Sequence, residues 1–432
     1  MKNMQAFSII ICNTWSEWET GLMEGGVKMN SLKTIVISDL HLGLNDWVSE
    51  DVANRPKLAS FIHKIRQEKL ADELVIAGDF LDQWIYPADA DLPRDSKVFY
   101  QACAKNNAEV IEALSALIKS GIPVIYVPGN HDMTLSHEIL SEILPGIRQA
   151  RDVPGLGRYR TGIRGEVVIE HSHRYEIVCA PDTITNAELM EYGYPILPFG
   201  YIFARVSVTS AIEGLLGSKD PSLKREFPAP AKPDVDDIAA CNAYAYWKFC
   251  TEVLNELTVV RESLDEKFIK VAVDGFAGQY SLSDLIPTYQ SDGSWDAGIY
   301  RNLVENWEEV QRRNLVPSPV SVAYSLEHAA DNKERFEVLP ARVYFDVDPS
   351  VDVVVFGHTH VPGYKEFSGY SSRKIFANSG TWVDNNIDDP KNNATFVMVD
   401  STPSGNTVQT LKVLGDGKVE DIVWADNDHI IR

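Results

Sequence analysis

Five short stretches of this chain combine carboxylate, amide and imidazole side chains, the groups that bind metal ions. They are Asp39-Leu40-His41, Gly78-Asp79-Phe80-Leu81-Asp82, Gly129-Asn130-His131-Asp132, His171-Ser172-His173 and Gly357-His358-Thr359-His360. Residues two apart in an extended segment point the same way, so the first and last stretches can each present two ligands to one cleft. Mixed ligands of this kind suit Mn, Fe, Zn or Ni better than Mg or Ca, which prefer oxygen ligands.

Taken alone, each stretch has a commoner explanation. Gly-Asp is ordinary turn chemistry, and a single His-x-His more often lies on the surface than in a metal site. Five such stretches in order, four of them directly after β-like runs, are hard to ascribe to turns. Two cations about 3.5–4 Å apart can together activate a water molecule and neutralise a phosphoryl oxygen. The pattern therefore predicts a metal-dependent site.

The segments between these stretches must position them. Apolar, β-branched runs predict strands, at residues 34–38, 74–77, 123–127, 167–170, 351–356, 373–377, 394–399 and 408–413. Apolar spacing predicts helices at residues 57–69, 96–119 and 136–144. Strand, polar loop and helix recur three times, which is typical of an α/β sheet with covering helices. Such sheets place their ligands at the carboxyl ends of the strands.

A different composition marks the middle of the chain. We predict helices at residues 234–266, 300–313 and 320–336. The expected organisation is an N-terminal extension (1–30), a first core part (31–180), a mainly helical insertion or cap (181–345) and a second core part (346–432). The most apolar run, residues 194–216, is interrupted by Arg205 and Glu213. We interpret it as a packed part of the cap, and we expect no transmembrane segment.

Composition narrows the class of protein. The formal net charge of −22 disfavours broad nucleic-acid binding, because an acidic surface repels a polyphosphate backbone. The five cysteines are scattered and form no Cys-x-x-Cys pair, which favours a reducing compartment and hence a cytoplasmic protein. Residues 6–12 are apolar, but the run is too short for a signal peptide and no small-residue cleavage site follows it.

The five stretches together resemble the signature of the calcineurin-like metallophosphoesterases, over about residues 33–175 and 350–400. This resemblance implies a four-layer α/β/β/α sandwich with a two-metal site between its sheets. It also implies a division of the ligands. One metal would be held by Asp39, His41 and His360, the other by Asn130, His171 and His358, and Asp79 would bridge the two.

The resemblance further implies a mechanism in which a hydroxide bridging the metals attacks phosphorus in line. His131 would stabilise the developing charge or protonate the leaving oxygen, with Asp132 orienting it. Other polar residues have looser expectations. Asp82 would support the site from behind the ligands, His173 would support it or face substrate, and Arg174, Tyr175 and Arg205 are candidates for gripping phosphate. Ser172 stands where the family commonly has glycine.

The leading hypothesis is therefore a hydrolase of a small phosphomonoester or phosphodiester, with the insertion selecting the substrate. The aromatic run at residues 194–203 raises a second enzyme hypothesis, a lipid-linked pyrophosphate hydrolase similar to the UDP-diacylglucosamine hydrolases. A third is a non-catalytic metal-binding scaffold of the same fold, since some members of this fold serve as binding scaffolds with a degraded metal site. The chain retains every expected ligand and His131, which favours an enzyme over a scaffold, and its acidic charge disfavours a nuclease.

Overall fold

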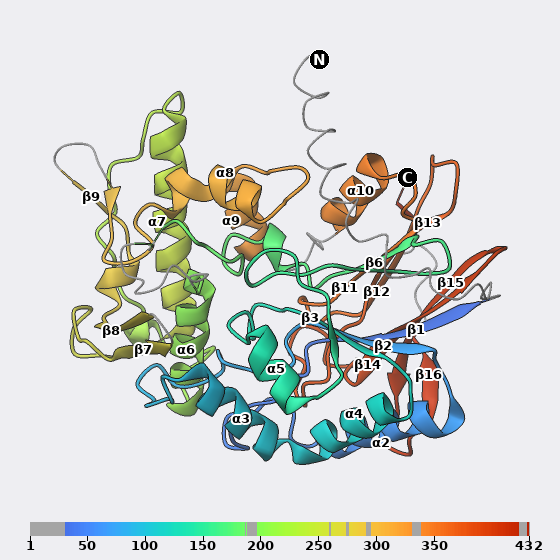
Figure 1. Cartoon of the computed structure of the whole chain (residues 1–432). Helices are drawn as coiled ribbons and strands as arrows, with labels where there is room; N and C mark the ends of the chain where they lie inside the picture. Colours follow the sequence, from blue (N-terminus) through green and yellow to red (C-terminus); the bar gives the residue numbers. More distant parts are fainter. Residues whose placement is uncertain are drawn as a thin grey trace.

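Two β-sheets stacked face to face form the body of the molecule, with helices on both outer sides (Figure 1). The computed structural model describes residues 31–185, 187, 197–258, 261–273, 276–290, 295–330, 338–422 and 430–431. The first sheet has the order β16-β15-β14-β1-β2-β3-β4, and the second has the order β17-β12-β13-β11-β6-β5. Strands β1 to β4 run parallel to one another, as do β6, β11 and β13.

The bounds of the strands agree closely with the sequence analysis. The first sheet comprises β1 (Leu32–Ile37), β2 (Glu73–Ala77), β3 (Val124–Val127), β4 (Arg148–Gln149), β14 (Thr395–Thr402), β15 (Gly405–Val413) and β16 (Val419–Asp421). The second comprises β5 (Tyr159–Thr161), β6 (Val167–Ile169), β11 (Val353–Phe356), β12 (Gly363–Phe367), β13 (Lys374–Asn378) and β17 (Ile430–Ile431). All eight predicted strands are present, and the strands that the sequence analysis missed are short or lie toward sheet edges.

Alternation of side chains along the central strands builds the layers. In β2, Leu74 and Ile76 pack against the outer helices, whereas Val75 and Ala77 point into the apolar layer between the sheets. Because both faces of these strands are buried, their sequences are almost continuously apolar. The layer between the sheets is closed from the second sheet by valines such as Val355.

Helices cover both outer faces, so the expected four-layer α/β/β/α sandwich is confirmed. Against the first sheet lie α2 (Arg55–Glu68), α3 (Ser96–Asn106), α4 (Ala108–Lys119) and α5 (His137–Ile143). On the other side α10 (Val338–Val347) packs on the second sheet through Ala341, Tyr344 and Phe345. In Figure 1, α2 and α4 lie below the first sheet and α10 lies above the second.

The prediction of one long helix over residues 96–119 is wrong, because the helix breaks at Asn107. The backbone of Asn107 leaves the helical region (φ −110°, ψ 33°). Its buried side-chain amide donates hydrogen bonds to the carbonyls of Cys103 (2.8 Å) and Gly43 (2.9 Å). Local hydrogen bonds of an Asn side chain compete with helix continuation, and here they also hold the loop that follows the Asp39-Leu40-His41 stretch.

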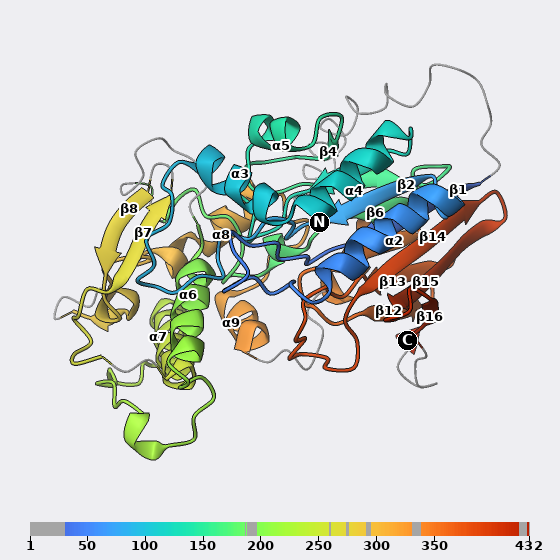
Figure 2. The same ribbon diagram turned by 90° about the horizontal axis from the view of Figure 1, so that it is seen from below.

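The segment predicted to form a cap has a hydrophobic cluster of its own. It contains α6 (Phe199–Ile212), α7 (Ile238–Leu257), α8 (Leu303–Arg313) and α9 (Val322–Ala330). It also contains two small hairpin sheets, β7 (Ile269–Val273) with β8 (Phe276–Tyr280) and β9 (Thr288–Tyr289) with β10 (Trp295–Asp296). Figures 1 and 2 show α6, α7, β7 and β8 gathered at the side of the molecule opposite to β1 and β15.

One predicted helix of this segment extends too far. The helix expected over residues 234–266 begins at Ile238, after the Asp237 cap, and ends at Leu257, where Thr258 turns into the left-handed region. The helix expected over residues 320–336 is observed as α9, and residues 331–337 lie outside the described residues. The N-terminal extension, residues 1–30, also lies outside them. No helix in the described ranges combines the length and apolar character needed to cross a membrane.

Asp51, a buried carboxyl group before α2, makes the stability of the fold depend on pH. Neither of its carboxylate oxygens has a hydrogen-bond partner among the described residues. Burial, reinforced by the negative charge of Asp384, raises the pKa of Asp51 to about 8. Because the pKa of Asp51 is higher in the folded than in the unfolded protein, the folded state is the one that keeps the proton as the pH rises. The stabilisation is fully present below the pKa of the unfolded chain and is lost as the pH rises through about 8.

We therefore predict that Asp51→Asn flattens this pH dependence. The free energy of unfolding of the variant, relative to that of the wild type, should increase steadily between pH 4 and pH 8, because asparagine cannot ionise. Urea denaturation of both proteins in chelator at a series of pH values measures the difference. A constant difference across this range would show that Asp51 is not the responsible group.

Candidate metal centre

The five predicted stretches meet at one place, the carboxyl ends of the central strands of both sheets. Each stretch begins within a few residues of a strand end, and the strands concerned are β1, β2 and β3 of the first sheet and β6 and β11 of the second. Parallel strands direct their carboxyl ends to one edge, which is where open α/β sheets place ligands. Residues from Asp39 to His360 are thereby brought into one cluster.

The first group of ligating atoms comes from Asp39, His41 and His360. One atom from each lies within 4.8 Å of the others. The Nε2 atoms of His41 and His360 are 3.0 Å apart, and Nε2 of His360 is 3.4 Å from Oδ1 of Asp39. Asp39 and His41 are almost completely buried, whereas the His360 side chain keeps 21% of its surface exposed.

The second group comes from Asp79, His171 and His358, with Asn130 beside them. Nε2 of His171 lies 3.2 Å from Oδ2 of Asp79 and 3.0 Å from Oδ1 of Asn130. Nδ1 of the same ring is 2.7 Å from the carbonyl oxygen of Ala77, to which it can only donate. In the neutral ring, therefore, the Nε2 lone pair faces two oxygen atoms. Three lone pairs directed at one point suit a bound cation, and this donor set fits a metal ion.

Asp79 lies between the two groups. Its Oδ2 atom is 3.2 Å from His171 Nε2 and 3.7 Å from His41 Nε2, so one carboxylate oxygen faces a histidine of each group. Its Oδ1 atom accepts a hydrogen bond from the backbone N–H of His131 at 2.9 Å. No other carboxylate in the described part of the chain has an oxygen within 4 Å of both His41 and His171.

The backbone is strained at most of these positions. Positive φ angles occur at Asp39 (53°), His41 (46°), Asp79 (51°), His358 (76°) and His360 (57°). Non-glycine residues rarely adopt this region, and such strain persists only where surrounding structure enforces it, typically at functional sites. The left-handed turns direct each side chain off its strand end toward the common centre.

The glycines before two of the ligands are required for close approach. A Cβ atom on Gly78, which has φ +89°, would collide with the His171 ring. One on Gly129 would collide with the backbone N and the carboxylate of Asp79. The Gly-Asp and Gly-Asn pairs of the sequence thus reflect how tightly the loops after β2 and β3 pack against the ligands.

Opposite charges stabilise one another within this buried cluster. Burial lowers the pKa of His171, but the carboxylates of Asp79 and Asp39 outweigh it and raise the pKa to about 9. Conversely, burial raises the pKa of Asp79, yet His171 and His131 hold it well below its usual value. For His41, burial and His131 lower the pKa, and Asp82 raises it to about 9. The carboxylates are therefore ionised at neutral pH.

His131 is oriented by a different carboxylate from the one expected. Its Nδ1 atom is 2.9 Å from Oδ2 of Asp82, which also lies 2.6 Å from Nδ1 of His41. Burial lowers the pKa of His131, but Asp82 and Asp79 raise it to about 9. Asp82 thus supports the site from behind, as expected, and it holds two imidazole rings at once.

The expectation that Asp132 orients His131 is wrong. The Asp132 carboxylate instead accepts hydrogen bonds from the backbone N–H groups of Phe80 and Gly129, both at 2.7 Å. Adjacent residues on this tight loop point to opposite sides, so Asp132 faces the backbone while His131 faces the ligands. Asp132 therefore ties the loop after β3 to the loop after β2.

The three residues considered as candidates for binding the substrate phosphate form hydrogen bonds or ion pairs with other protein groups instead. Arg174 is buried and pairs with Glu170 (2.7 Å) and Asp152 (2.8 Å). The hydroxyl of Tyr175 donates to Glu170, and Arg205 donates to backbone carbonyls, including that of Pro87 at 2.7 Å. These expectations are wrong, because each polar head serves as an internal support.

His173 was expected either to support the site or to face substrate, and the structure favours the supporting role. The ring is buried, and its Nε2 atom lies 3.0 Å from the carbonyl oxygen of Gly155. Burial and the neighbouring His171 hold the pKa of His173 well below its usual value, so the ring is neutral.

Sequence reasoning missed two neighbours of the site. Oε2 of Glu176 lies 2.5 Å from Nε2 of His358, and Glu176 and His358 form a further candidate ligand group with Cys179. Trp84 stacks on the ring of His131, with centroids 4.5 Å apart and planes at 24°. Neither belongs to a short motif with ligand spacing, although Trp84 lies only two residues beyond Asp82.

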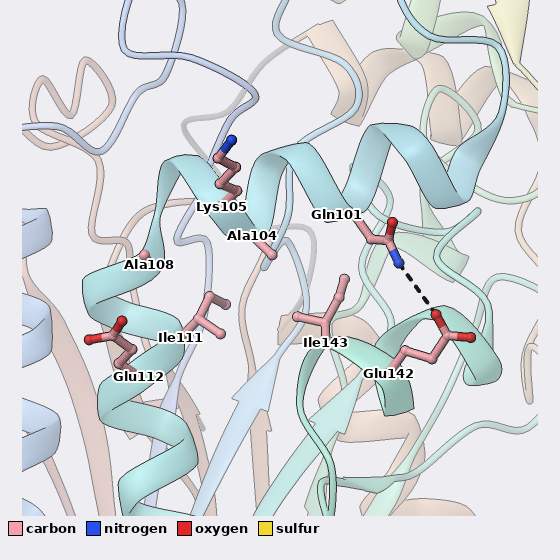
Figure 3. Close-up of a pocket in the computed structure, with 8 residues that line it drawn as sticks. All are labelled: Gln101, Ala104, Lys105, Ala108, Ile111, Glu112, Glu142 and Ile143. Atoms are coloured by element: carbon pink, nitrogen blue, oxygen red, sulfur yellow. Dashed lines mark hydrogen bonds between the residues drawn. The ribbon is translucent and has the colours of Figure 1, made fainter.

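A separate pocket lies away from this centre. Figure 3 shows it between α3, α4 and α5, where Gln101 and Glu142 are joined by a hydrogen bond across its rim. Its volume is about 280 Å³. None of its lining residues belongs to the candidate metal centre, so it carries no argument about the chemistry.

Comparison with known proteins agrees with the geometry. A family model described as calcineurin-like phosphoesterase matches residues 32–200. This part of the chain is therefore similar to the calcineurin-like phosphoesterases, and the match supports a metal-dependent hydrolase of phosphoric esters. A comparison with curated proteins gives no match.

Solved structures give only distant similarity. A predicted phosphoesterase from Streptococcus pneumoniae is 10% identical and has a TM-score of 0.28, with 91% of this chain and 98% of that chain covered. A dimetal phosphatase from Danio rerio is 12% identical (TM-score 0.33; 88% and 98% covered). A phosphopantetheinyl hydrolase from Mycobacterium tuberculosis is also 12% identical (TM-score 0.26; 82% and 91% covered). Scores this low carry no argument about function.

The geometry of Ser172 yields a stability prediction. Ser172 has φ 89°, and its buried hydroxyl has no hydrogen-bond partner among the described residues. A non-glycine residue in the left-handed region costs about 1–2 kcal/mol. Glycine avoids this cost but loses more backbone entropy on folding, which offsets part of the gain. Ser172→Gly should therefore raise the free energy of unfolding by about 1 kcal/mol. The midpoint of urea denaturation measures this change, and the metal content should remain that of the wild type.

A matched control is Ser210→Gly. Ser210 is also buried, and its hydroxyl has no partner in the described part of the chain, but it lies in the last turn of α6. Replacing serine by glycine in a helix should lower the free energy of unfolding by about 0.5 kcal/mol. Equal effects of the two substitutions would contradict the role assigned to the φ angle of Ser172.

Proposed function

We propose that the chain hydrolyses a small phosphomonoester or phosphodiester with two metal ions held at this centre. One ion would be held by Asp39, His41 and His360, the other by Asn130, His171 and His358, with Asp79 shared between them. Mn, Fe, Zn and Ni suit this mixed nitrogen and oxygen donor set. When bound, such a pair of ions supplies an activated water and neutralises charge on the phosphoryl group.

The observation that carries this proposal is the position of Asp79. Its Oδ2 atom faces His41 at 3.7 Å and His171 at 3.2 Å, so a single buried carboxylate reaches both ligand groups. A scaffold that had lost its metals would have no reason to maintain this strained, lone-pair-rich arrangement. We therefore favour the enzyme over the non-catalytic scaffold.

His131 is the proposed general acid. Asp82 holds its Nδ1 atom at 2.9 Å, which leaves Nε2 as the nitrogen that carries the transferable proton. A raised pKa, to about 9, keeps this ring protonated at neutral pH. Proton donation from a positioned imidazole to the leaving oxygen typically contributes about 10²–10⁴-fold to the rate.

The insertion is proposed to influence substrate choice, but the aromatic run does not favour a lipid-linked substrate. Within it, Phe199, Tyr201 and Ile202 are at most 1% exposed and pack in the insertion's own cluster. Residues 194–196 of that run lie outside the described residues. These buried side chains fill the interior, so no specific observation supports the pyrophosphate hydrolase alternative.

Partners and location stay predictions. The acidic net charge disfavours nucleic acid as a substrate. The four cysteines among the described residues are free, which fits the predicted cytoplasmic compartment.

The proposed function predicts that turnover depends on metal. Protein stripped by a chelator should show no turnover of p-nitrophenyl phosphate or bis-p-nitrophenyl phosphate, and reloading with Mn, Zn or Ni should restore it. The ratio of the two rates would distinguish a monoesterase from a diesterase. Two bound ions per chain without turnover under any of these metals would favour a non-catalytic scaffold that binds metal, or an enzyme whose cap admits only a narrow range of substrates.

The proposed general-acid role of His131 predicts the effect of His131→Ala. Both metals should remain bound, because His131 is not among the proposed ligands, while turnover of an alkyl phosphate ester, whose alkoxide leaving group needs a proton, should fall by about 10²–10⁴-fold. Metal analysis and steady-state kinetics test the two statements separately. His137→Ala, an exposed histidine in α5, is the control and should leave turnover unchanged. Unchanged turnover in His131→Ala would make the general-acid assignment wrong.

A further inference from the structure

Trp84 connects the proposed general acid to the insertion. The indole ring is 2% exposed and lies nearly parallel to the His131 ring, with centroids 4.5 Å apart. Asp82, which holds His131 Nδ1, also accepts a hydrogen bond from the backbone N–H of Trp84 at 2.6 Å. The backbone N–H of Gln83 donates to the carbonyl of His131 at 3.0 Å. The His131 ring is therefore fixed at its nitrogen by Asp82 and across its face by Trp84.

The insertion supports the opposite side of this stack. Tyr201, in the first turn of α6, meets Trp84 edge to face with centroids 6.0 Å apart. Gly200 allows the close approach, since a Cβ atom there would lie 3.4 Å from Trp84 and would collide with the carbonyl of Val178. Trp84 accordingly packs in the hydrophobic cluster of the insertion, with Phe199 and Trp307, and not in the cluster beneath the first sheet.

We infer that Trp84 is a positioning residue for His131, and that the first turn of α6 holds it in place. The inference rests on the proposed function, because it gives the insertion a part in proton donation to the leaving oxygen. A flat indole face restricts tilting of the imidazole ring, while the hydrogen bond to Asp82 restricts its rotation. Together they would hold the Nε2–H bond in the direction of the leaving group.

This role predicts a loss that depends on the leaving group. Departure of p-nitrophenolate needs little proton donation, whereas departure of an alkoxide depends on it. Trp84→Leu removes the flat face and should lower kcat for an alkyl phosphate ester by about 10²-fold, the scale expected for a catalytic group misplaced by about 1 Å. The kcat for the matching p-nitrophenyl ester should fall much less, with KM and metal content little changed for both.

Three variants make the test specific. Trp84→Phe retains a flat ring and should preserve most of the activity on the alkyl ester. Trp307→Leu is the matched control, because Trp307 is also 2% exposed, packs in the same cluster and lacks a partner for its indole nitrogen among the described residues. It should lower the melting temperature without changing the ratio of the two rates. If Trp84→Leu does not fold, Trp84→Met takes its place, because the unbranched and flexible methionine side chain adapts to the shape of the space.

The outcomes separate this inference from the proposed function on which it rests. His131→Ala supplies the reference ratio of alkyl to p-nitrophenyl turnover. If His131→Ala lowers both rates equally, the general-acid role fails, and the inference fails with it. If His131→Ala is selective but Trp84→Leu (or Trp84→Met) is not, the proposed function stands and the role of Trp84 is wrong. A ratio that changes equally in Trp307→Leu would show that only the packing of the insertion matters.

Discussion

The candidate centre depends on the apolar contact between the two sheets. Asp39, Asp79 and Asn130 follow strands of the first sheet, whereas His171 and His358 follow strands of the second. Neither sheet alone carries a complete set of donors for either group. The layer of valines, isoleucines and alanines between the sheets therefore sets the separation of the donors, and any shift of one sheet over the other would move the two halves of the site apart.

Carboxylates behind the donors then fix their orientation. Asp82 holds the rings of His41 and His131 with a single oxygen atom, and Asp132 joins the loops after β2 and β3 through backbone N–H groups. Supporting groups of this kind set the direction and basicity of the atoms in front of them. The network also explains how so many ionisable groups can be buried together. Carboxylates and imidazole rings alternate in the cluster, so that their opposite charges offset one another.

The sequence predicted the parts of this arrangement that follow simple periodicity. Continuous apolar runs identified eight strands of the two stacked sheets, including all those that precede the candidate ligands, and the short motifs identified the residues that gather at the strand ends. The assignment of Asp132 failed because adjacent residues on a tight loop face opposite sides, a matter of φ and ψ that spacing does not reveal. The prediction of an unbroken helix through Asn107 failed for a similar reason. The side-chain amide of Asn107 donates a hydrogen bond to the carbonyl of Gly43, 64 residues earlier, and local spacing does not reveal such a contact. The contact of Trp84 with Tyr201 depends on how the insertion packs, and that of Glu176 with His358 joins residues 182 apart in the chain, so no local pattern encodes either.

The position of the insertion also sets the order in which the site can form. His41 and His360 are 319 residues apart in the chain, yet their ring nitrogens lie 3.0 Å apart. A chain emerging from the ribosome can pair β1, β2 and β3 early, but β11 and its two histidines follow only after the entire insertion. Long-range pairing of this kind is slow, and domains of this size commonly fold through intermediates. The nascent protein would thus pass through a stage in which β1 to β4 have been made but His358, His360 and the strands β14 to β16 of the first sheet have not.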